Sequence, residues 1–74
     1  MEEKFIQLFR EALEIEDKEV NLTDNFRQYE EWDSLAYLSV IAMIDEEFDV
    51  QIEGKEFKEL KTVGDIIEAI KAKK

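Results

Sequence analysis

Ser34 is the side chain of this sequence with the most favourable setting for chemistry. It follows Asp33, a residue type that caps helices, and it precedes the most apolar stretch of the chain, residues 35–44, where nine of ten residues are apolar. A hydroxyl at the start of a helix lies beside free backbone N–H groups and the positive end of the helix dipole, which favour an attached phosphate. Position and residue type alone also fit a serine that only helps to begin a helix.

Ser34 has no neighbour in the sequence that could make it a catalytic nucleophile. The chain has no His, and no Lys lies between Lys18 and Lys55. A serine hydroxyl attacks only when an adjacent base takes its proton. We therefore expect that any reaction at Ser34 is catalysed by another protein, and that the chain itself is not an enzyme.

Acidic residues offer two candidate cation sites, and both patterns are weak. The carboxylates in residues 45–49 have the pattern of the solvated end of an amphipathic helix, where charge runs usually lie. A calcium loop starting at Asp17 would need Gly at its sixth position and Glu at its twelfth, but Leu22 and Gln28 stand there. The sequence therefore predicts no metal site.

The composition excludes several classes of function. The 74 residues (8.8 kDa) allow one small domain, residues 1–74, and they carry 10 Lys and Arg against 20 Asp and Glu, a net charge of −10 with a pI near 4.3. This balance argues against nucleic acid and anionic membrane surfaces, and it favours a partner with a basic patch. The absence of Cys excludes disulfides and thiolate sites.

No targeting or membrane-spanning segment is predicted. Residues 1–4 are acidic in balance, and the apolar runs 35–38 and 40–44 are far shorter than the ~20 residues that span a bilayer. We expect a cytoplasmic protein without stable membrane insertion.

The spacing of the apolar residues predicts an all-α fold, a small antiparallel bundle of three main helices and one short helix. The main helices are expected at Glu2–Ile15, Ser34–Asp49 and Thr62–Lys74, and the short one at Gly54–Lys61. The connection Glu16–Asp33 is long for a compact domain, and such loops are usually functional or packed by their own side chains.

The charges around the second helix are unevenly distributed. Residues 28–54 contain eight acids and no Lys or Arg. We therefore expect the helix that Ser34 begins to be bracketed by negative charge, which would attract basic patches and raise encounter rates.

Four separate motifs, in order and at matching spacing, resemble those of the acyl carrier proteins. Residues 33–35, Asp-Ser-Leu, resemble the family's D-S-L, and Phe26 stands eight residues before Ser34, where the family commonly has Phe. Residues 46–52, Glu-Glu-Phe-Asp-Val-Gln-Ile, resemble the end of the family's second helix, and residues 62–65, Thr-Val-Gly-Asp, resemble the start of its last helix. The resemblance covers almost the whole chain.

The resemblance implies a cofactor and the residues that hold it. In this family the serine of D-S-L carries 4'-phosphopantetheine through a phosphodiester bond, so Ser34 would be its attachment position. Asp33 and Leu35 would belong to the same binding site, and Asp33 would help to seat the phosphopantetheinyl transferase and its Mg²⁺. Acyl groups would be held as thioesters on the arm, and the protein would be a carrier on which enzymes act.

The resemblance also implies a cargo pocket and a partner surface. Acyl chains can be sheltered between helices in this family, and the candidate pocket residues here are Val40, Ile44 and Ile52, which also fit ordinary core packing. The partners would be ligases, synthases and transferases with basic patches, met transiently by a monomer. The candidate partner contacts are the apolar Leu35, Ala42 and Met43 and the acidic Asp33, Asp45 and Glu46.

The sequence departs from the family pattern around Ser34. The family usually has Leu three positions and Gly two positions before the D of D-S-L, but Glu30 and Glu31 stand there, followed by Trp32. Acids often follow the serine by two and five residues, where this sequence has Ala36 and Ser39. These departures fit either a specialised carrier with a dedicated pathway or drift within a lineage.

Three functions remain open on the sequence. The first is an acyl carrier protein in fatty acid or related acyl biosynthesis. The second is an aminoacyl or peptidyl carrier on the same scaffold, which the reduced acidity of the second helix leaves open. The third is an unmodified acidic helical adaptor, for which Ser34 would be dispensable and binding to a basic partner would be sensitive to salt.

Overall fold

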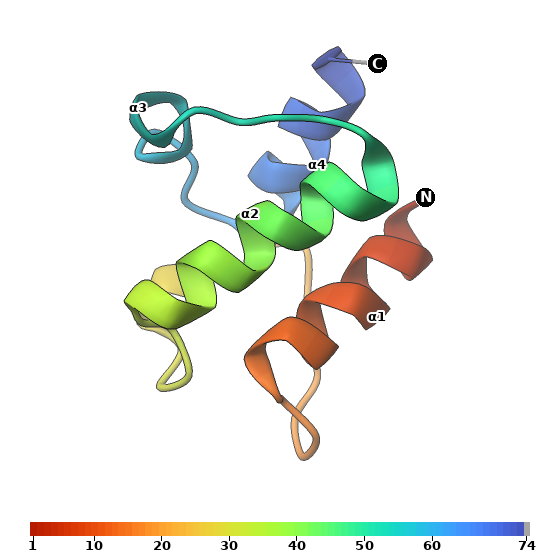
Figure 1. Ribbon diagram of the computed structural model, residues 1–74. Helices are drawn as coiled ribbons and strands as arrows, with labels where there is room; N and C mark the ends of the chain where they lie inside the picture. The colour runs from red at the N-terminus through yellow and green to blue at the C-terminus, as the bar shows by residue number, and fades with distance from the viewer. Residues whose placement is uncertain (74) are drawn as a thin grey trace.

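The computed structural model describes residues 1–73, which form a helical bundle (Figure 1). Its elements are four α-helices and one 3₁₀ helix, in the order α1 (Glu2–Leu13), η1 (Phe26–Gln28), α2 (Ser34–Phe48), α3 (Gly54–Phe57) and α4 (Val63–Lys73). Within residues 1–73 the extended backbone pairs only at an isolated bridge between Asn25 and Thr62. The all-α prediction of three main helices and one short helix is confirmed.

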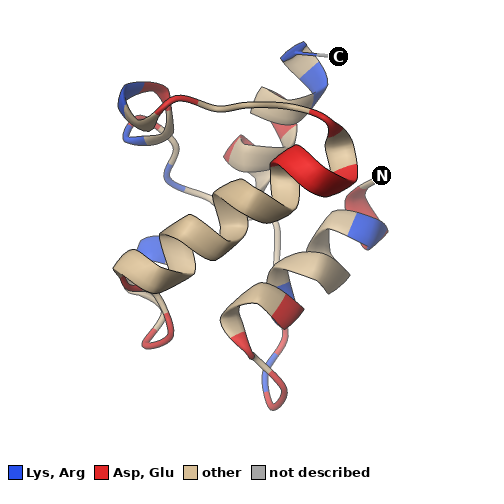
Figure 2. Cartoon of the chain, in the orientation of Figure 1, with Lys and Arg blue, Asp and Glu red and all other residues tan. Residues whose placement is uncertain are grey.

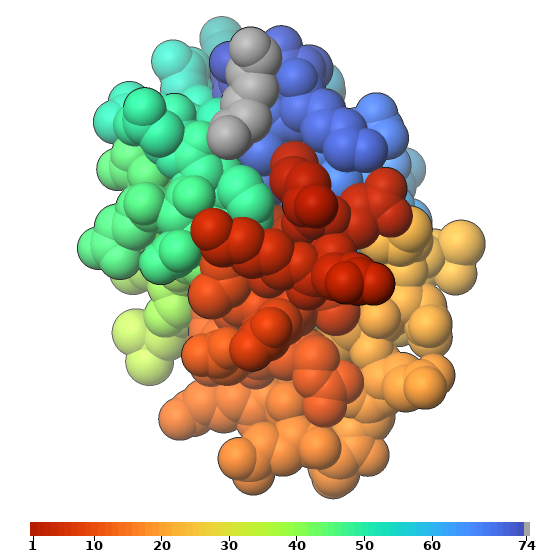
Figure 3. Space-filling view, turned by 90° about the vertical axis from the view of Figure 1, so that its right-hand side faces the viewer, coloured from red at the N-terminus to blue at the C-terminus, as the bar shows by residue number. Residues whose placement is uncertain are grey.

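α1 forms because its apolar residues follow the helical period. Phe5, Phe9 and Leu13 are buried and lie on one face, while Glu2 and Glu3 occupy the first turn, where the helix dipole favours acids. α1 packs against α2, and Figure 3 shows it lying between the C-terminal part of α2 and the loop that follows α1.

α2 has apolar residues on more than its buried face. Ala36, Val40, Ile44 and Phe48 follow a four-residue spacing and are buried. The opposite face is also apolar, because Leu35 is 74% exposed and Leu38 is 59% exposed. An apolar stripe of this helix therefore remains in solvent.

Three helices end earlier than predicted, α2 by a single residue and α1 and α3 by more. α1 ends at Leu13 rather than Ile15, and α2 ends at Phe48 rather than Asp49, because Glu14 and Asp49 turn into the left-handed region (φ 58° and φ 56°) and stop the helices there. α3 ends at Phe57 rather than Lys61.

α4 begins at a reciprocal pair of side-chain caps. The backbone N–H of Asp65 donates to Thr62 Oγ1 (3.1 Å), and the N–H of Thr62 donates to Asp65 Oδ2 (3.1 Å). This arrangement is the capping box that the spacing of the two residues indicates. The predicted start is therefore correct within one residue, and the predicted end, Lys74, lies outside the described residues.

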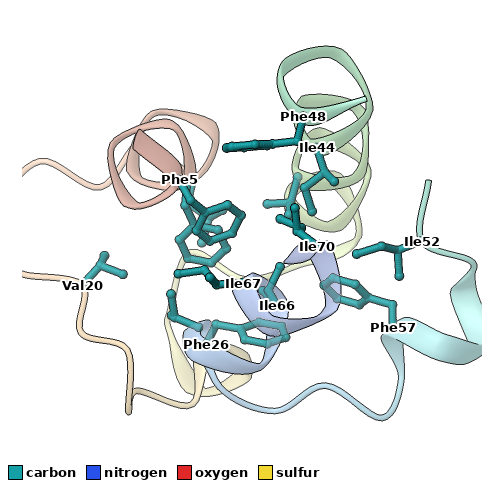
Figure 4. Close-up of a cluster of buried hydrophobic side chains, with 14 of the residues drawn as sticks. Phe5, Val20, Phe26, Ile44, Phe48, Ile52, Phe57, Ile66, Ile67 and Ile70 are labelled. Carbon is teal, nitrogen blue, oxygen red and sulfur yellow. The ribbon is translucent and has the colours of Figure 1, made fainter. Parts of the chain in front are cut away.

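The core joins all four helices and the long loop (Figure 4). Phe5 stacks on Phe9 with ring centroids 5.5 Å apart, and Phe26 from the loop meets Phe9 edge to face. α4 contributes the isoleucines 66, 67 and 70, and none of the buried side chains in residues 1–73 is polar or charged. This arrangement fixes α2 and α3 on either side of the space beside Ser34.

The loop between α1 and α2 is packed by its own side chains, as its length indicates. Val20 and Phe26 are buried in the core. The loop backbone also bonds to the start of α4, through the N–H of Gly64 to the Leu22 carbonyl (2.9 Å). A Cβ on Gly64 would lie 3.1 Å from that carbonyl oxygen, so the close approach of the two segments favours glycine.

Candidate functional site

Ser34 is the first residue of α2 and its side chain is exposed. Asp33 caps the helix, since its Oδ1 accepts the backbone N–H of Ala36 at 2.8 Å, as its residue type predicts. The cap fixes the first turn of α2 and leaves the hydroxyl of Ser34 on the surface at the positive end of a fifteen-residue helix. Because this oxygen is exposed, a phosphate ester on it would have free space around it, and the helix dipole would favour its negative charge.

A cavity of about 350 Å³ opens beside Ser34, between the loop, α2 and α3. Its floor is aromatic: Trp32 stacks on Phe57 with ring centroids 5.9 Å apart and planes 12° apart, and Tyr37 meets Phe57 at 5.2 Å. The lining comprises Arg27, Trp32, Asp33, Ser34, Tyr37, Gly54, Phe57 and Lys58.

Arg27 is held in place at the rim of this cavity. Its Nε donates to the Leu60 carbonyl (3.1 Å) and its Nη2 to the Phe57 carbonyl (2.8 Å). The guanidinium also lies over the rings of Phe26 and Phe57, at 5.1 and 5.5 Å from their centroids. These contacts tie the loop to the end of α3 and keep a positive charge next to the site.

Sequence reasoning missed Arg27 and Lys58 as neighbours of Ser34. Both lie outside residues 28–54, which contain no cation, and the fold brings them to the cavity from two other segments. Ser34 is therefore not surrounded by negative charge alone. The available signal was weak, because only the tertiary arrangement places residue 58 beside residue 34.

Two residues that depart from the family pattern, Glu31 and Trp32, contact other parts of the chain. Lys18 donates a hydrogen bond to Glu31 (2.9 Å), which lowers the pKa of the Glu31 carboxyl and raises that of the Lys18 ammonium. Trp32 packs edge to face on Phe26, with ring centroids 4.7 Å apart. The segment before Ser34 is thus fastened to the preceding loop and to the core.

A hydrogen-bond network orders the loop that leads to Ser34. Tyr29 donates its hydroxyl to Asp24 Oδ2 (2.7 Å), and the backbone N–H of Asn21 donates to the same oxygen (3.0 Å). The N–H of Asn21 and the Tyr29 hydroxyl lower the pKa of the Asp24 carboxyl, while burial and the adjacent carboxylate raise that of Tyr29. Asp24 is therefore ionised and Tyr29 neutral around pH 7.

Most of the residues expected to contact partners lie on α2, on the C-terminal side of Ser34. Leu35, Ala42, Asp45 and Glu46 are exposed, and Met43 is half-buried against the core. Figure 2 shows the acidic residues of α2 gathered at its C-terminal end, while the rest of the helix is uncharged. Sequence reasoning missed Leu38, which follows Leu35 by one helical turn and is exposed on the same face.

The residues expected to line an acyl pocket lie in the interior. Val40 and Ile44 are completely buried in α2, and Ile52 is buried in the segment that leads to α3. Ile52 also borders a hollow with Ile41 and Gln51, further along α2 from Ser34. The three residues belong to one hydrophobic core.

Two further properties concern residues 1–73 as a whole. No group of three or more acidic, His or Cys side chains is arranged to hold a metal ion in this part of the chain. None of its helices combines the length and the apolar character needed to cross a bilayer.

Comparison with known proteins shows the family to which the chain belongs. The family described as "Phosphopantetheine attachment site" matches residues 3–70. The chain belongs to the acyl carrier protein family. An acyl carrier protein of Prochlorococcus marinus (strain MIT 9515) is 32% identical over 72 residues, which are 97% of this chain and 90% of that one. One of Clostridium acetobutylicum is 30% identical over 70 residues, 95% of this chain and 91% of that one.

The fold agrees with this family. The solution structure of a holo acyl carrier protein from Geobacter metallireducens superposes with a TM-score of 0.83, covering 97% of this chain and 83% of that one, at 19% identity. Membership of the family means that the chain is a carrier rather than a catalyst, and that it takes a covalently attached phosphopantetheine. The exposed hydroxyl and the adjoining cavity fit such a group, whose thiol supplies the thioester chemistry that a chain without Cys lacks.

Proposed function

We propose that Ser34 is the attachment position and that the protein carries acyl groups as thioesters on the 4'-phosphopantetheine arm. The observation that supports this most is the exposed Ser34 hydroxyl at the capped start of α2, beside a cavity with two cations on its rim. Asp33 and Leu35 belong to the same binding site, where Asp33 holds the helix start and helps to seat the transferase.

The modification is a transfer reaction supplied by a phosphopantetheinyl transferase. The Ser34 oxygen loses its proton and forms a bond to the phosphorus of coenzyme A that bears the pantetheine. The bond from that phosphorus to the nucleotide phosphate breaks, and adenosine 3',5'-bisphosphate leaves. The chain has no His to act as a base for Ser34, and the carboxylate next to it, Asp33, is engaged in capping.

The partner surface proposed for this carrier is the exposed side of α2. Leu35, Ala42 and Met43 offer apolar contacts, while Asp33, Asp45 and Glu46 pair with Lys and Arg of a partner enzyme. Such pairs raise association rates more than they add affinity. The partners are ligases, synthases and transferases that meet a cytoplasmic monomer in which residues 1–74 act as one domain.

The pathway proposed first is fatty acid or related acyl biosynthesis. Val40, Ile44 and Ile52 are the inner residues that a long acyl chain would reach if it displaced the side chains packed around them. A second candidate is an aminoacyl or peptidyl carrier. Ala36 and Ser39 favour it, because they replace acids on α2 and leave Leu35 and Leu38 as an uncharged exposed face.

The attachment is tested by intact mass after incubation with coenzyme A, Mg²⁺ and a broad-specificity phosphopantetheinyl transferase. We expect the wild type to gain the mass of one phosphopantetheine and Ser34→Ala to gain none. Ser39→Ala, which removes another exposed hydroxyl of α2, is the matched control and should be loaded fully. A mass gain that persists in Ser34→Ala would refute the assignment, and no gain in any variant would favour the unmodified adaptor.

A further inference from the structure

Three aromatic side chains separate Ser34 from the interior of the bundle. Trp32 stacks on Phe57, and the Tyr37 ring packs against the same Phe57. The Tyr37 hydroxyl oxygen lies 3.3 Å from the position that a Cβ on Gly54 would take, so this side chain reaches from α2 to the start of α3. On the side of Ser34, these rings form the floor of the cavity between α2 and α3.

The core behind these rings offers no ready space. Val40 and Ile44 are completely buried, and Phe57 is 2% exposed. An alkyl chain that starts at Ser34 would have to displace Tyr37 or Phe57 to reach them. Displacing a packed ring sacrifices its contacts with every neighbour, which makes this route costly.

The cavity in front of the rings also differs in charge from other hollows of the surface. Arg27 and Lys58 outnumber Asp33 in its lining. Hollows at the C-terminal end of α1 and beside α3 are each lined by three glutamates and one cation. In a chain with a net charge of −10, a positively charged cavity beside Ser34 suits the phosphodiester of an arm attached there.

We propose that this outer cavity, and not the core, receives the acyl end of the arm, and that it selects short acyl groups with a flat apolar part, such as aryl or unsaturated acyl groups. The inference rests on the proposed attachment at Ser34. A flat group stacks on the partly exposed rings of Trp32 and Tyr37, whereas a long flexible chain gains little from them. The tether holds the acyl end at an effective concentration of roughly millimolar, so even a weak site is occupied.

The test compares acyl groups on the intact protein. The transferase is given benzoyl- or decanoyl-coenzyme A, and intact mass verifies the loading. Trp32 is the single Trp of the sequence, so its fluorescence reports on the cavity directly. We expect the benzoyl form to change Trp32 emission and to raise Tm by about 4–8 °C over the form with the free thiol, and the decanoyl form to do neither.

A variant distinguishes the outer cavity from the core. Tyr37→Ala removes the ring that spans α2 and α3, and should let the decanoyl form gain thermal stability over its free-thiol form while the benzoyl effect weakens. Leu38→Ala is the matched control, since Leu38 is the next residue, is exposed and does not line the cavity. If Tyr37→Ala does not fold, the comparison of the two acyl groups on the wild type still decides the question.

The possible results separate the two proposals. A decanoyl form of the wild type that is more stable than the benzoyl form would overturn the outer-cavity inference and place the cargo in the core. Full loading with no change in Trp32 emission would also overturn it, while leaving the attachment at Ser34 intact. Failure of every acyl donor to load would instead refute the proposed function.

Discussion

Asp33 orders the start of α2, where Ser34 lies, through a hydrogen bond to a residue three positions later in the chain. Its side chain accepts the Ala36 N–H, which fixes the first turn of α2 and directs the serine into solvent. The same kind of reasoning predicts the pair Thr62 and Asp65 at the start of α4. Caps could be predicted from the sequence because donor and acceptor are separated by only three residues.

Asp65 offers a test of a cap through its charge. Its carboxylate accepts the N–H groups of Lys61 and Thr62, which lower its pKa below the ordinary value. We expect Asp65→Ala to cost about 1 kcal/mol at pH 7, measured by urea unfolding. A group with a depressed pKa in the folded state stabilises above its unfolded pKa, and this contribution is lost as the pH falls through the folded pKa.

The difference in unfolding free energy between wild type and Asp65→Ala should therefore shrink as the pH falls below about 4. Glu68→Ala, an exposed acid on the same helix, is the control and should change stability by less than about 0.5 kcal/mol. A difference for Asp65→Ala that is constant with pH would show that the ionised carboxylate contributes nothing beyond its shape.

The elements were predictable wherever a long periodic stripe defines them, and less so at their ends. α2 and α4 begin where their caps stand, but α1 ends two residues earlier than its apolar pattern indicates. The reason is Glu14, which takes the left-handed conformation without being glycine, so the sequence has no signal for the stop. α3 has a single turn, which is too short to show a periodic apolar pattern, so its end could not be predicted from the sequence.

The left-handed Glu14 predicts a stabilising substitution. Glu14→Gly should raise stability by about 0.5–1 kcal/mol, because relief of the strained backbone exceeds the added entropy of the unfolded chain, and Tm should rise by roughly 4 °C. Glu11→Gly, three residues earlier and inside α1, should instead lower stability by about 1 kcal/mol. Calorimetry on both variants checks this, and two changes of the same sign would disprove the explanation.

At the scale of the molecule, the site combines segments that are far apart in the chain. The cavity takes Arg27 and Trp32 from the loop, Tyr37 from α2, and Phe57 and Lys58 from α3 or just after it. Sequence reasoning could find Ser34 because its signal is local. It could not find the cavity or its positive rim, because these depend on how the loop and α3 pack around α2.

Net charge governs a further property of the whole molecule. Twenty acids against ten basic residues repel one another in the folded state, while the ion pairs Lys4–Glu47, Lys71–Glu2 and Lys73–Glu56 join helices across the surface. Exposed pairs contribute little, so repulsion should dominate. We expect Tm to rise by a few degrees when NaCl is increased from about 0.02 M to about 0.5 M, because salt shortens the Debye length to a few ångströms.

Measuring Tm against the concentration of sucrose, an uncharged additive, controls for general effects on solvation. A Tm that falls with added NaCl would mean that the ion pairs between helices outweigh the repulsion, against the prediction.

The backbone bonds between the loop and the start of α4 bear on how the protein is made. Leu22 and Asp24 accept the N–H groups of Gly64 and Val63, so the loop before Ser34 receives these partners only when the last helix has been synthesised. A chain in which α4 has not docked leaves these carbonyls without their partners and uncovers the core side chains that α4 buries. A transferase that requires the folded surface around Ser34 would thus recognise chains with α4 in place and pass over incompletely folded ones.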